Sequence, residues 1–253
     1  MKWKTSLSQL DNGREKIRGY DLGELVEKST FVDSIFLLWL GRLPSKNESR
    51  MLNALFTSCL DHGVGASSTT VARTVASTGN SVHTALAAGI TALGELHGGA
   101  IEGAAYFLKE HVGEDVSALA KSTREKKIRV PGFGHRVLPH DDRADVLFKI
   151  AKETGFYLKH CVFAEKLAGE LVSSSGKKIP LNIDGAMAAI ILDMGIDPRL
   201  AKGFFLAGRV PGLIAHIYEE QGSGEGLRRI SEDEIEYTGE KGRSFAPTQD
   251  DNI

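Results

Sequence analysis

The sequence contains little cysteine, no long apolar run and little net charge. Its only cysteines, Cys59 and Cys161, stand alone, so neither belongs to the closely spaced pairs of a zinc site. So few cysteines favour a reducing compartment, and we expect a cytoplasmic protein; residues 1–5 also lack the apolar run of a signal peptide. No stretch of about 18 uninterrupted apolar residues predicts a membrane span. The formal net charge of −2 does not indicate a nucleic acid or an acidic membrane as partner.

Helical periodicity runs through most of the 253 residues, of which 42% are hydrophobic and 25% charged. Asp21 is expected to cap a first helix, and Ser45 another. Further helices are expected over about 31–41, 46–61, 71–79, 81–95, 100–111, 144–172 and 199–220. Because no run of alternating strands and no internal repeat occurs, the predicted fold class is mainly α.

The length fits one domain, or one domain with a smaller lobe. Residues 5–20 are polar and rich in turn signals, and residues 173–178 are expected to form a mobile basic linker. From Gly222 the chain is polar. We therefore expect a domain over 1–239 and a frayed polar tail over 240–253.

One stretch, residues 129–138, fits neither an amphipathic helix nor a strand. Pro131 restricts the backbone, whereas Gly132 and Gly134 permit shapes that other residues resist. This pattern indicates a shaped loop whose backbone closely approaches a ligand and which ends by presenting His135. The competing interpretation is an ordinary surface turn with a histidine, and the loop alone does not decide between the two.

Polar residues with useful chemistry stand at the junctions between the expected helices: His62, His97, His135, Arg143, Asp184, Arg209 and Arg229. Several have ordinary alternatives. His62 would complement the dipole of a helix C-terminus, His97 would be a core histidine satisfied by backbone, and Asp184 would be an N-cap. A buried Arg209, in an otherwise apolar segment, would need an anion.

The histidines lack zinc-site spacing, so no metal is expected, and there is neither a nucleophile elbow nor a phosphate loop. What remains is an anion pocket of arginines and histidines with one carboxylate placed for proton transfer. Such a pocket suits carbon–carbon bond making or breaking beside a carbonyl, because an enol needs a donor at its oxygen.

Four motifs in order resemble the citrate synthase superfamily. They are Leu96-His97-Gly98-Gly99-Ala100, Val130-Pro131-Gly132-Phe133-Gly134-His135 with Arg143, Asn182-Ile183-Asp184, and Arg209 within residues 208–216. The resemblance covers nearly the whole chain up to about Gly239. It implies a compact helical fold with room for a small CoA-binding lobe within about 64–180.

Two departures from the pattern of citrate synthases point in different directions. Here Leu43-Pro44 leads through a single helix to Asp61-His62-Gly63, without the long helical block that citrate synthases have. This reduced layout, and residues 227–237, resemble the citryl-CoA lyase module of ATP-citrate lyase and its stand-alone relatives. The fused lyase, however, lacks the histidine found here as His97, which is a synthase-like feature.

The resemblance implies a role for each matching residue. Asp184 would move the proton, and His97 would stabilise the enol(ate) oxygen of acetyl-CoA. Citrate or oxaloacetate would be held by His62, His135, Arg143, Arg209 and an arginine from a neighbouring subunit, Arg229 or its competitor Arg228. The backbone of Val130, Pro131, Gly132 and Gly134 would receive the CoA adenine, and Lys177 and Lys178 would meet its phosphates. The alternative for these two lysines is a solvated linker.

The function that the resemblance implies is a citryl-CoA lyase that cleaves citryl-CoA to acetyl-CoA and oxaloacetate. It would act as a homodimer or higher homo-oligomer. CoA would enter only as part of substrate and product, with no tightly bound cofactor. One alternative is a small citrate or 2-methylcitrate synthase. Another is a non-catalytic subunit that binds CoA or citrate, although such a binder has no need for both His97 and Asp184.

Overall fold

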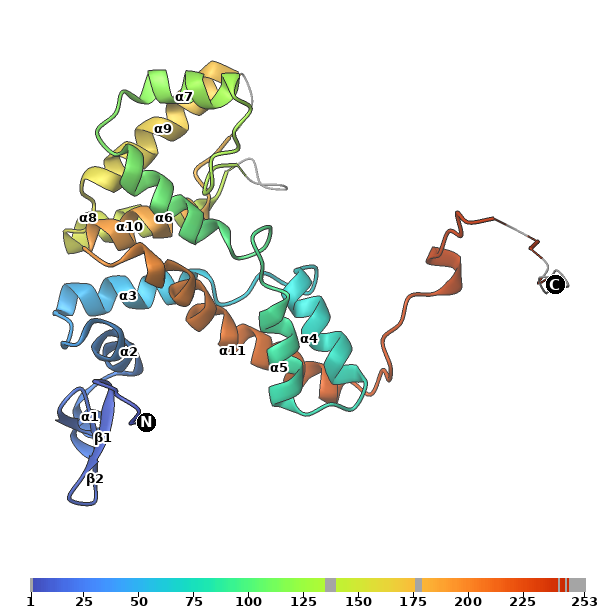
Figure 1. Cartoon of the computed structure of the whole chain (residues 1–253), viewed down its shortest axis with the longest axis horizontal. Coiled ribbons are helices and arrows are strands. Elements are labelled where there is room, and N and C mark those ends of the chain that lie inside the picture. The colour runs from blue at the N-terminus through green and yellow to red at the C-terminus, as the bar shows by residue number, and fades with distance from the viewer. Residues whose placement is uncertain (1, 135–139, 176–178, 241, 244, 246–253) are drawn as a thin grey trace, which may run out of the picture.

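The computed structural model describes residues 2–134, 140–175, 179–240, 242–243 and 245. Within these residues the chain forms eleven α-helices and one small sheet, which confirms the mainly α prediction (Figure 1). No helix of this part is long and apolar enough to cross a membrane. The expected division into domain, lobe and tail stays a prediction.

The N-terminal residues form a three-stranded antiparallel sheet that the sequence did not predict. It consists of β1 (Ser8–Asp11), β2 (Arg14–Ile17) and β3 (Tyr20–Asp21) in that order. The expected turn connects β1 to β2, with Asn12 at φ 49° and Gly13 at φ 75°, as a tight hairpin turn requires. Because the strands are short, polar and exposed, they carry no alternating apolar pattern.

Both predicted helix caps are confirmed. The Asp21 side chain accepts hydrogen bonds from the first turn of α1 (Leu22–Lys28), and Ser45 forms a capping box at α3 (Lys46–Ser58). Between them lies α2 (Phe31–Leu40). Helix α3 ends three residues earlier than expected. His62 therefore lies beyond its last turn, and the helix-dipole alternative for His62 loses its basis.

Small residues let α4 (Ser67–Ser77), α5 (Val82–Thr91) and α11 (Ala201–Gly222) pack closely against one another. A Cβ atom on Gly89 would lie 3.0 Å from the Cβ of Ala72, so glycine permits this approach. A short 3₁₀ turn, η1 (Pro198–Leu200), leads into α11.

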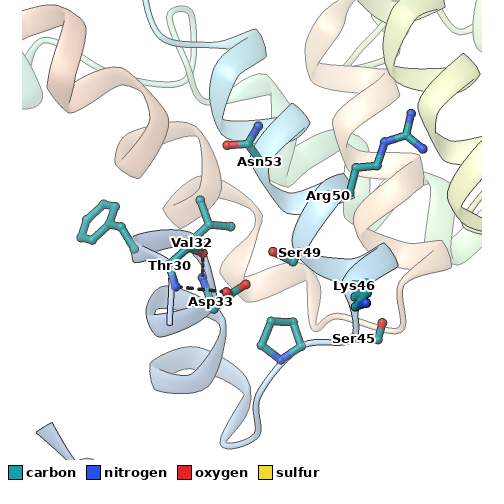
Figure 2. Close-up of a pocket in the computed structure, with 10 residues that line it drawn as sticks. Thr30, Val32, Asp33, Ser45, Lys46, Ser49, Arg50 and Asn53 are labelled. Carbon is teal, nitrogen blue, oxygen red and sulfur yellow. Dashed lines mark hydrogen bonds between the residues drawn. The ribbon is translucent and has the colours of Figure 1, made fainter. Parts of the chain in front are cut away.

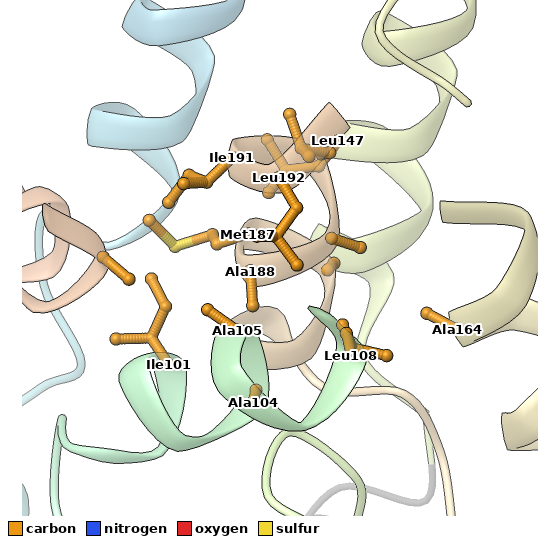
Figure 3. Close-up of a cluster of buried hydrophobic side chains, with 14 of the residues drawn as sticks. Ile101, Ala104, Ala105, Leu108, Leu147, Ala164, Met187, Ala188, Ile191 and Leu192 are labelled. Atoms are coloured by element: carbon orange, nitrogen blue, oxygen red, sulfur yellow. The ribbon is translucent and has the colours of Figure 1, made fainter. Parts of the chain in front are cut away.

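The centre of the molecule is α10 (Ile183–Asp193), which is apolar nearly all round, as a fully buried helix should be. Around it lie α6 (Ala100–His111), α8 (Asp142–Thr154) and α9 (Lys159–Ser175). Figure 3 shows side chains of α6 meeting those of α10 in this core. Helix α7 (Val116–Glu125) packs against α9.

Two expectations for this region are wrong. The single helix expected over 144–172 is two helices, because Gly155 takes a left-handed conformation (φ 85°) and ends α8. Residues 173–175, expected in a linker, continue α9 instead. The rest of that linker lies outside the described residues.

After α11 the chain leaves the body of the protein (Figure 1). Every described residue after Glu220 is exposed, and the only regular element there is the 3₁₀ turn η2 (Glu232–Glu234). We call residues 223–240 the C-terminal arm. Its apolar side chains include Ile230 and Tyr237, which are 68% and 66% exposed. The rest of the same chain therefore does not cover these apolar side chains. Of the tail expected over 240–253, most residues are not described.

Candidate active site

Asp184 is the second residue of the central helix α10, and burial changes its acidity. Burial raises the pKa of the Asp184 carboxyl to about 6, although the charge of Arg143 opposes the shift. Its Oδ1 atom is buried and has no hydrogen-bond partner within the described part of the chain. The N-cap alternative is wrong, because the cap is Asn182, whose side chain accepts a hydrogen bond from Gly185 N at 3.1 Å. A buried carboxylate left unsatisfied by the fold is a candidate proton acceptor.

The loop that contains Gly132 and Gly134, which we call the glycine loop, packs against the start of α10. Gly132 O accepts a hydrogen bond from Asn182 N at 3.1 Å, and the Asn182 side chain donates to Gly134 O at 2.8 Å. A Cβ atom on Gly132 would lie 2.6 Å from the Cα of Gly185, and one on Gly185 would lie 2.4 Å from Gly132 O. The close backbone approach that the sequence indicates is thus made in part to the protein's own helix, and it fixes the turn that carries Asp184.

The same loop also lines a hollow of about 290 Å³. Its walls are mostly apolar and come from Ile128, Arg129, Val130, Phe133, Gly134, Leu171 and Ile179. Two of the expected adenine-binding residues, Val130 and Gly134, therefore border a cavity. The other two, Pro131 and Gly132, do not line it.

Arg209 is buried in α11, as the sequence suggested. Its side chain donates from Nε to Cys59 O at 2.8 Å and stacks on the Phe205 ring, whose centroid is 4.9 Å away. The buried Nη1 atom has no partner among the described residues. Burial lowers the pKa of this guanidinium despite the nearby carboxyls of Asp61 and Asp184. A buried cation with an unused donor suits an anionic ligand.

Glycine residues explain how Arg209 reaches this position. A Cβ atom on Gly208 would lie 2.3 Å from the Cys59 sulfur, and one on Gly212 would lie 2.0 Å from Leu60 O. Only glycine allows the backbone of α11 to rest against the end of α3. That contact brings Arg209 next to the chain leading to His62.

Arg143 pairs with a carboxylate that the sequence interpretation missed. Arg143 donates from Nε and Nη2 to the two oxygens of Asp141, each at 2.9 Å. Asp141, only 1% exposed, also accepts a hydrogen bond from Ile183 N at 2.9 Å. Its position two residues before Arg143 was the one signal in the sequence. Together with Arg209, these two charges act on the Asp184 carboxyl.

His97 lies in the turn between α5 and α6 and contacts the start of α4. The backbone amide of Ser68 donates to His97 Nε2 at 3.3 Å, and the Ser68 hydroxyl lies 2.9 Å from the same atom. Since an amide can only donate, Nε2 is the acceptor, and the neutral ring carries its proton on Nδ1. The alternative of a histidine satisfied by backbone is correct for Nε2.

The remaining predicted residues are exposed or lie outside the described residues. His62 is exposed in the segment between α3 and α4. Arg229 is exposed on the C-terminal arm, whereas its competitor Arg228 is bound to Glu220 at 2.6 Å in its own chain. His135, Lys177 and Lys178 lie outside the described residues.

Two further features were not predicted. A larger, open hollow of about 610 Å³ between α2 and α3 contains none of the predicted site residues (Figure 2). Among the described residues, the exposed side chains of His140, Asp142 and Asp145 bring their ligand atoms within 4.8 Å of one another. They already form ion pairs with each other on the surface, so we assign no metal to them.

The arrangement around Asp184 joins a buried carboxylate of raised pKa, two guanidinium groups and the start of a buried helix. A carboxylate whose pKa is about 6 can accept a proton and return it near neutral pH. The guanidinium groups can hold an anionic reactant beside it, and a neutral histidine can donate to a developing oxyanion. Proton transfer on a small polyanion is the chemistry that these groups suit.

Comparison with known proteins gives a consistent result. The family model described as "Citrate synthase, C-terminal domain" matches residues 45–230. The solved citryl-CoA lyase from Hydrogenobacter thermophilus is 44% identical, with a TM-score of 0.91, and the match covers 96% of this chain and 97% of that one. ATP citrate lyase from Methanothrix soehngenii, solved with citrate and coenzyme A, shows the same fold, with a TM-score of 0.85 at 23% identity over 95% of this chain and 42% of that chain.

A curated relative, citrate synthase 2 of Bacillus subtilis, is 33% identical over 215 residues, which are 83% of this chain and 56% of the relative. The chain spans about half the length of the curated relatives it matches. The expected fold, reduced relative to a full-length citrate synthase, is thereby confirmed. The chain belongs to the citrate synthase family.

Proposed function

We propose that this protein is a citryl-CoA lyase, which cleaves citryl-CoA to acetyl-CoA and oxaloacetate. The observation that carries the proposal is Asp184, a buried carboxylate with a pKa of about 6 under the influence of Arg143 and Arg209. The 44% identity to a citryl-CoA lyase over nearly the full length of both chains supports the lyase over other activities of the family.

The reaction needs only one proton to move, and one carboxylate can move it. The Asp184 carboxylate takes the proton of the citryl hydroxyl, and the new carbonyl of oxaloacetate forms as the carbon–carbon bond breaks. The bonding electrons pass to the thioester carbonyl and give the enolate of acetyl-CoA. Asp184 then returns the proton to the enolate carbon, which becomes the methyl group. No water is consumed, so the atoms balance.

His97 would stabilise the enolate. Because Ser68 N–H donates to Nε2, the ring proton lies on Nδ1, and we assign the hydrogen bond to the thioester oxygen to that nitrogen. A neutral donor suits this role, since it strengthens its bond as charge develops on the oxygen without protonating it fully in the resting state.

Arg209 and Arg143 would hold the carboxylates of the citryl group. The buried Nη1 of Arg209 is an unused donor, and a carboxylate of the substrate would satisfy it. Arg143 is 29% exposed in its side chain, so its outer face can reach a ligand while Asp141 holds its inner face. His62 and His135 would complete the pocket.

The hollow beside the glycine loop would receive the adenine of CoA. Its apolar walls suit a flat base, and Arg129 brings a positive charge to its edge. Lys177 and Lys178 would meet the phosphates as point charges.

A second copy of the chain would complete the site through the C-terminal arm. Arg228 is held by Glu220 and Glu225 of its own chain, so it anchors the root of the arm. The next residue, Arg229, is exposed and is the arginine that we assign to a neighbouring subunit's pocket. The protein would therefore act as a homodimer or a higher homo-oligomer.

The runner-up is a small citrate or 2-methylcitrate synthase, favoured by the 33% identity to citrate synthase 2 of Bacillus subtilis. The two functions differ in net direction. With acetyl-CoA and oxaloacetate supplied, we expect negligible net citrate, whereas supplied citryl-CoA should release oxaloacetate rapidly, measured by coupled reduction with malate dehydrogenase. Efficient net citrate formation would refute the lyase in favour of the synthase. A protein that binds CoA but turns over neither substrate would be a non-catalytic subunit.

A further inference from the structure

Asp141 is a buried carboxylate that accepts more hydrogen bonds than a helix cap needs. It caps α8 by accepting from Arg143 N at 3.3 Å, which is an ordinary cap role. Caps of this kind are usually open to water, yet Asp141 is only 1% exposed. Burying a carboxylate is costly unless other groups compensate it, so its remaining bonds are informative.

Those bonds connect the two sides of the candidate site. One oxygen, Oδ1, accepts from Arg143 Nε at 2.9 Å, and the other, Oδ2, accepts from Arg143 Nη2 at 2.9 Å. Oδ2 also accepts from Ile183 N at 2.9 Å. Ile183 is the first residue of α10, immediately before Asp184. A single carboxylate thus joins an anion-binding arginine to the backbone that carries the base.

We propose that Asp141 is a positioning residue, which locks the guanidinium of Arg143 against the first turn of α10 and keeps it from pairing directly with Asp184. The inference rests on the proposed role of Asp184 as the base. A bidentate pair fixes the plane of a guanidinium, so Arg143 keeps one orientation toward substrate. Without the pair, Arg143 would be free to pair with the base itself, whose carboxyl its charge already influences, and an ion-paired base is a weak one.

The electrostatics agree with this role. The described charges that act on the Asp184 carboxyl are Arg143 and Arg209, which lower its pKa, and Asp141, which raises it. Removing the charge of Asp141 takes away one contribution that raises the pKa. It also releases Arg143 from its ion pair, so that its guanidinium can move toward Asp184, which lowers the pKa further. Both changes lower the pKa of Asp184, so a measurement of that pKa tests the role of Asp141.

The test is Asp141→Asn in the full chain, with the Asp184 carboxyl followed by ¹³C NMR titration and assigned by difference from Asp184→Asn. We expect the pKa of Asp184 to fall by roughly one unit. The acid limb of the kcat/KM profile for citryl-CoA should move to lower pH by the same amount, and kcat should fall at least tenfold. An unchanged Asp184 pKa in a folded Asp141→Asn protein would overturn the proposal.

Asp193→Asn is the matched control. The Asp193 side chain is also only 1% exposed, and it accepts hydrogen bonds from the start of a neighbouring helix, from Leu158 N at 2.8 Å and His160 N at 3.0 Å. It lies at the opposite end of α10, roughly 14 Å along the helix axis from Asp184. Its loss should lower stability without moving the pKa of Asp184. A shift of equal size in both variants would mean that general loosening of α10, not Asp141, causes the effect.

Two further outcomes are distinguishable. Should Asp141→Asn fail to fold, Arg143→Gln with Asp141 intact gives the opposite expectation, a rise in the pKa of Asp184, and no rise would refute the coupling. Should the wild-type protein fail to cleave citryl-CoA, the proposed function is wrong, while the NMR titration still decides the role of Asp141.

Discussion

The backbone amide of Ser68 points its proton at Nε2 of His97 across 3.3 Å. This contact does two things at once. It gives α4 an acceptor at its first turn, where the residue at the cap position, Ala66, has no side chain that could serve. It also places the ring proton of His97 on Nδ1, which makes the histidine a neutral hydrogen-bond donor.

Replacing His97 by Ala should therefore impair chemistry and, more mildly, stability. Loss of the donor to the enolate should lower kcat for citryl-CoA cleavage by roughly 10²-fold with little change in KM. Loss of the acceptor at α4 should cost about 1 kcal/mol in urea unfolding. His83→Ala, at an exposed histidine near the start of α5, is the control. Wild-type kcat in His97→Ala would exclude a role in catalysis.

The raised pKa of Asp184 also predicts how stability depends on pH. Its ordinary value is 3.8 and its value in the folded protein is about 6, so the unfolded chain ionises first as pH rises. The carboxyl therefore costs no stability below about pH 4, and the cost grows until pH passes 6. Asp184→Asn should be more stable than wild type at pH 8 by up to about 3 kcal/mol, and this gain should vanish at pH 4. Urea titrations at the two pH values measure it; a gain independent of pH would contradict the assignment.

Arg209→Gln should separate binding from folding. The buried Nη1 atom lacks a partner among the described residues, so its loss removes a substrate contact. It also takes from Cys59 O the hydrogen bond that Arg209 Nε donates to it. We expect oxaloacetate affinity to fall roughly tenfold to a hundredfold by calorimetry, as for a charge-assisted hydrogen bond. Arg199→Gln, an exposed arginine paired with Asp197, is the control and should bind normally. Unchanged affinity in Arg209→Gln would place the anion elsewhere.

Subunit complementation tests the C-terminal arm. Asp184→Asn and Arg229→Ala should each be inactive alone, because each lacks one part of every site. After unfolding and refolding together in equal amounts, mixed dimers would contain one intact site, and activity should recover to about a quarter of wild type. No recovery, with mixed dimers demonstrated by mass spectrometry, would mean that Arg229 serves its own subunit.

The helices and several site residues were predictable because they depend on local pattern and on resemblance. Asp21, Ser45 and Gly41 mark helix ends by chemistry that acts within a few residues, and the structure agrees. Asp184 and Arg209 were identified by motif. In the structure, burial raises the pKa of Asp184 and lowers that of Arg209, as it does for groups in a binding site.

What sequence reasoning missed depends on contacts between distant segments. Asp141 was not identified because its decisive bond, to Ile183 N, joins positions 42 residues apart. The close approach of Gly185 to Gly132 was missed because nothing in the sequence shows that these two glycines meet. The hairpin over 8–17 was missed because exposed polar strands carry no apolar alternation.

The fate of citryl-CoA tests the central claim most directly. The purified protein is given citryl-CoA, and the products are separated by chromatography and mass spectrometry at early times. A lyase converts it to acetyl-CoA and oxaloacetate, with little free citrate and CoA above the uncatalysed background, and Asp184→Asn abolishes the conversion. Enzyme-dependent release of citrate and free CoA as the main products would show thioester hydrolysis, and the protein would then be a synthase.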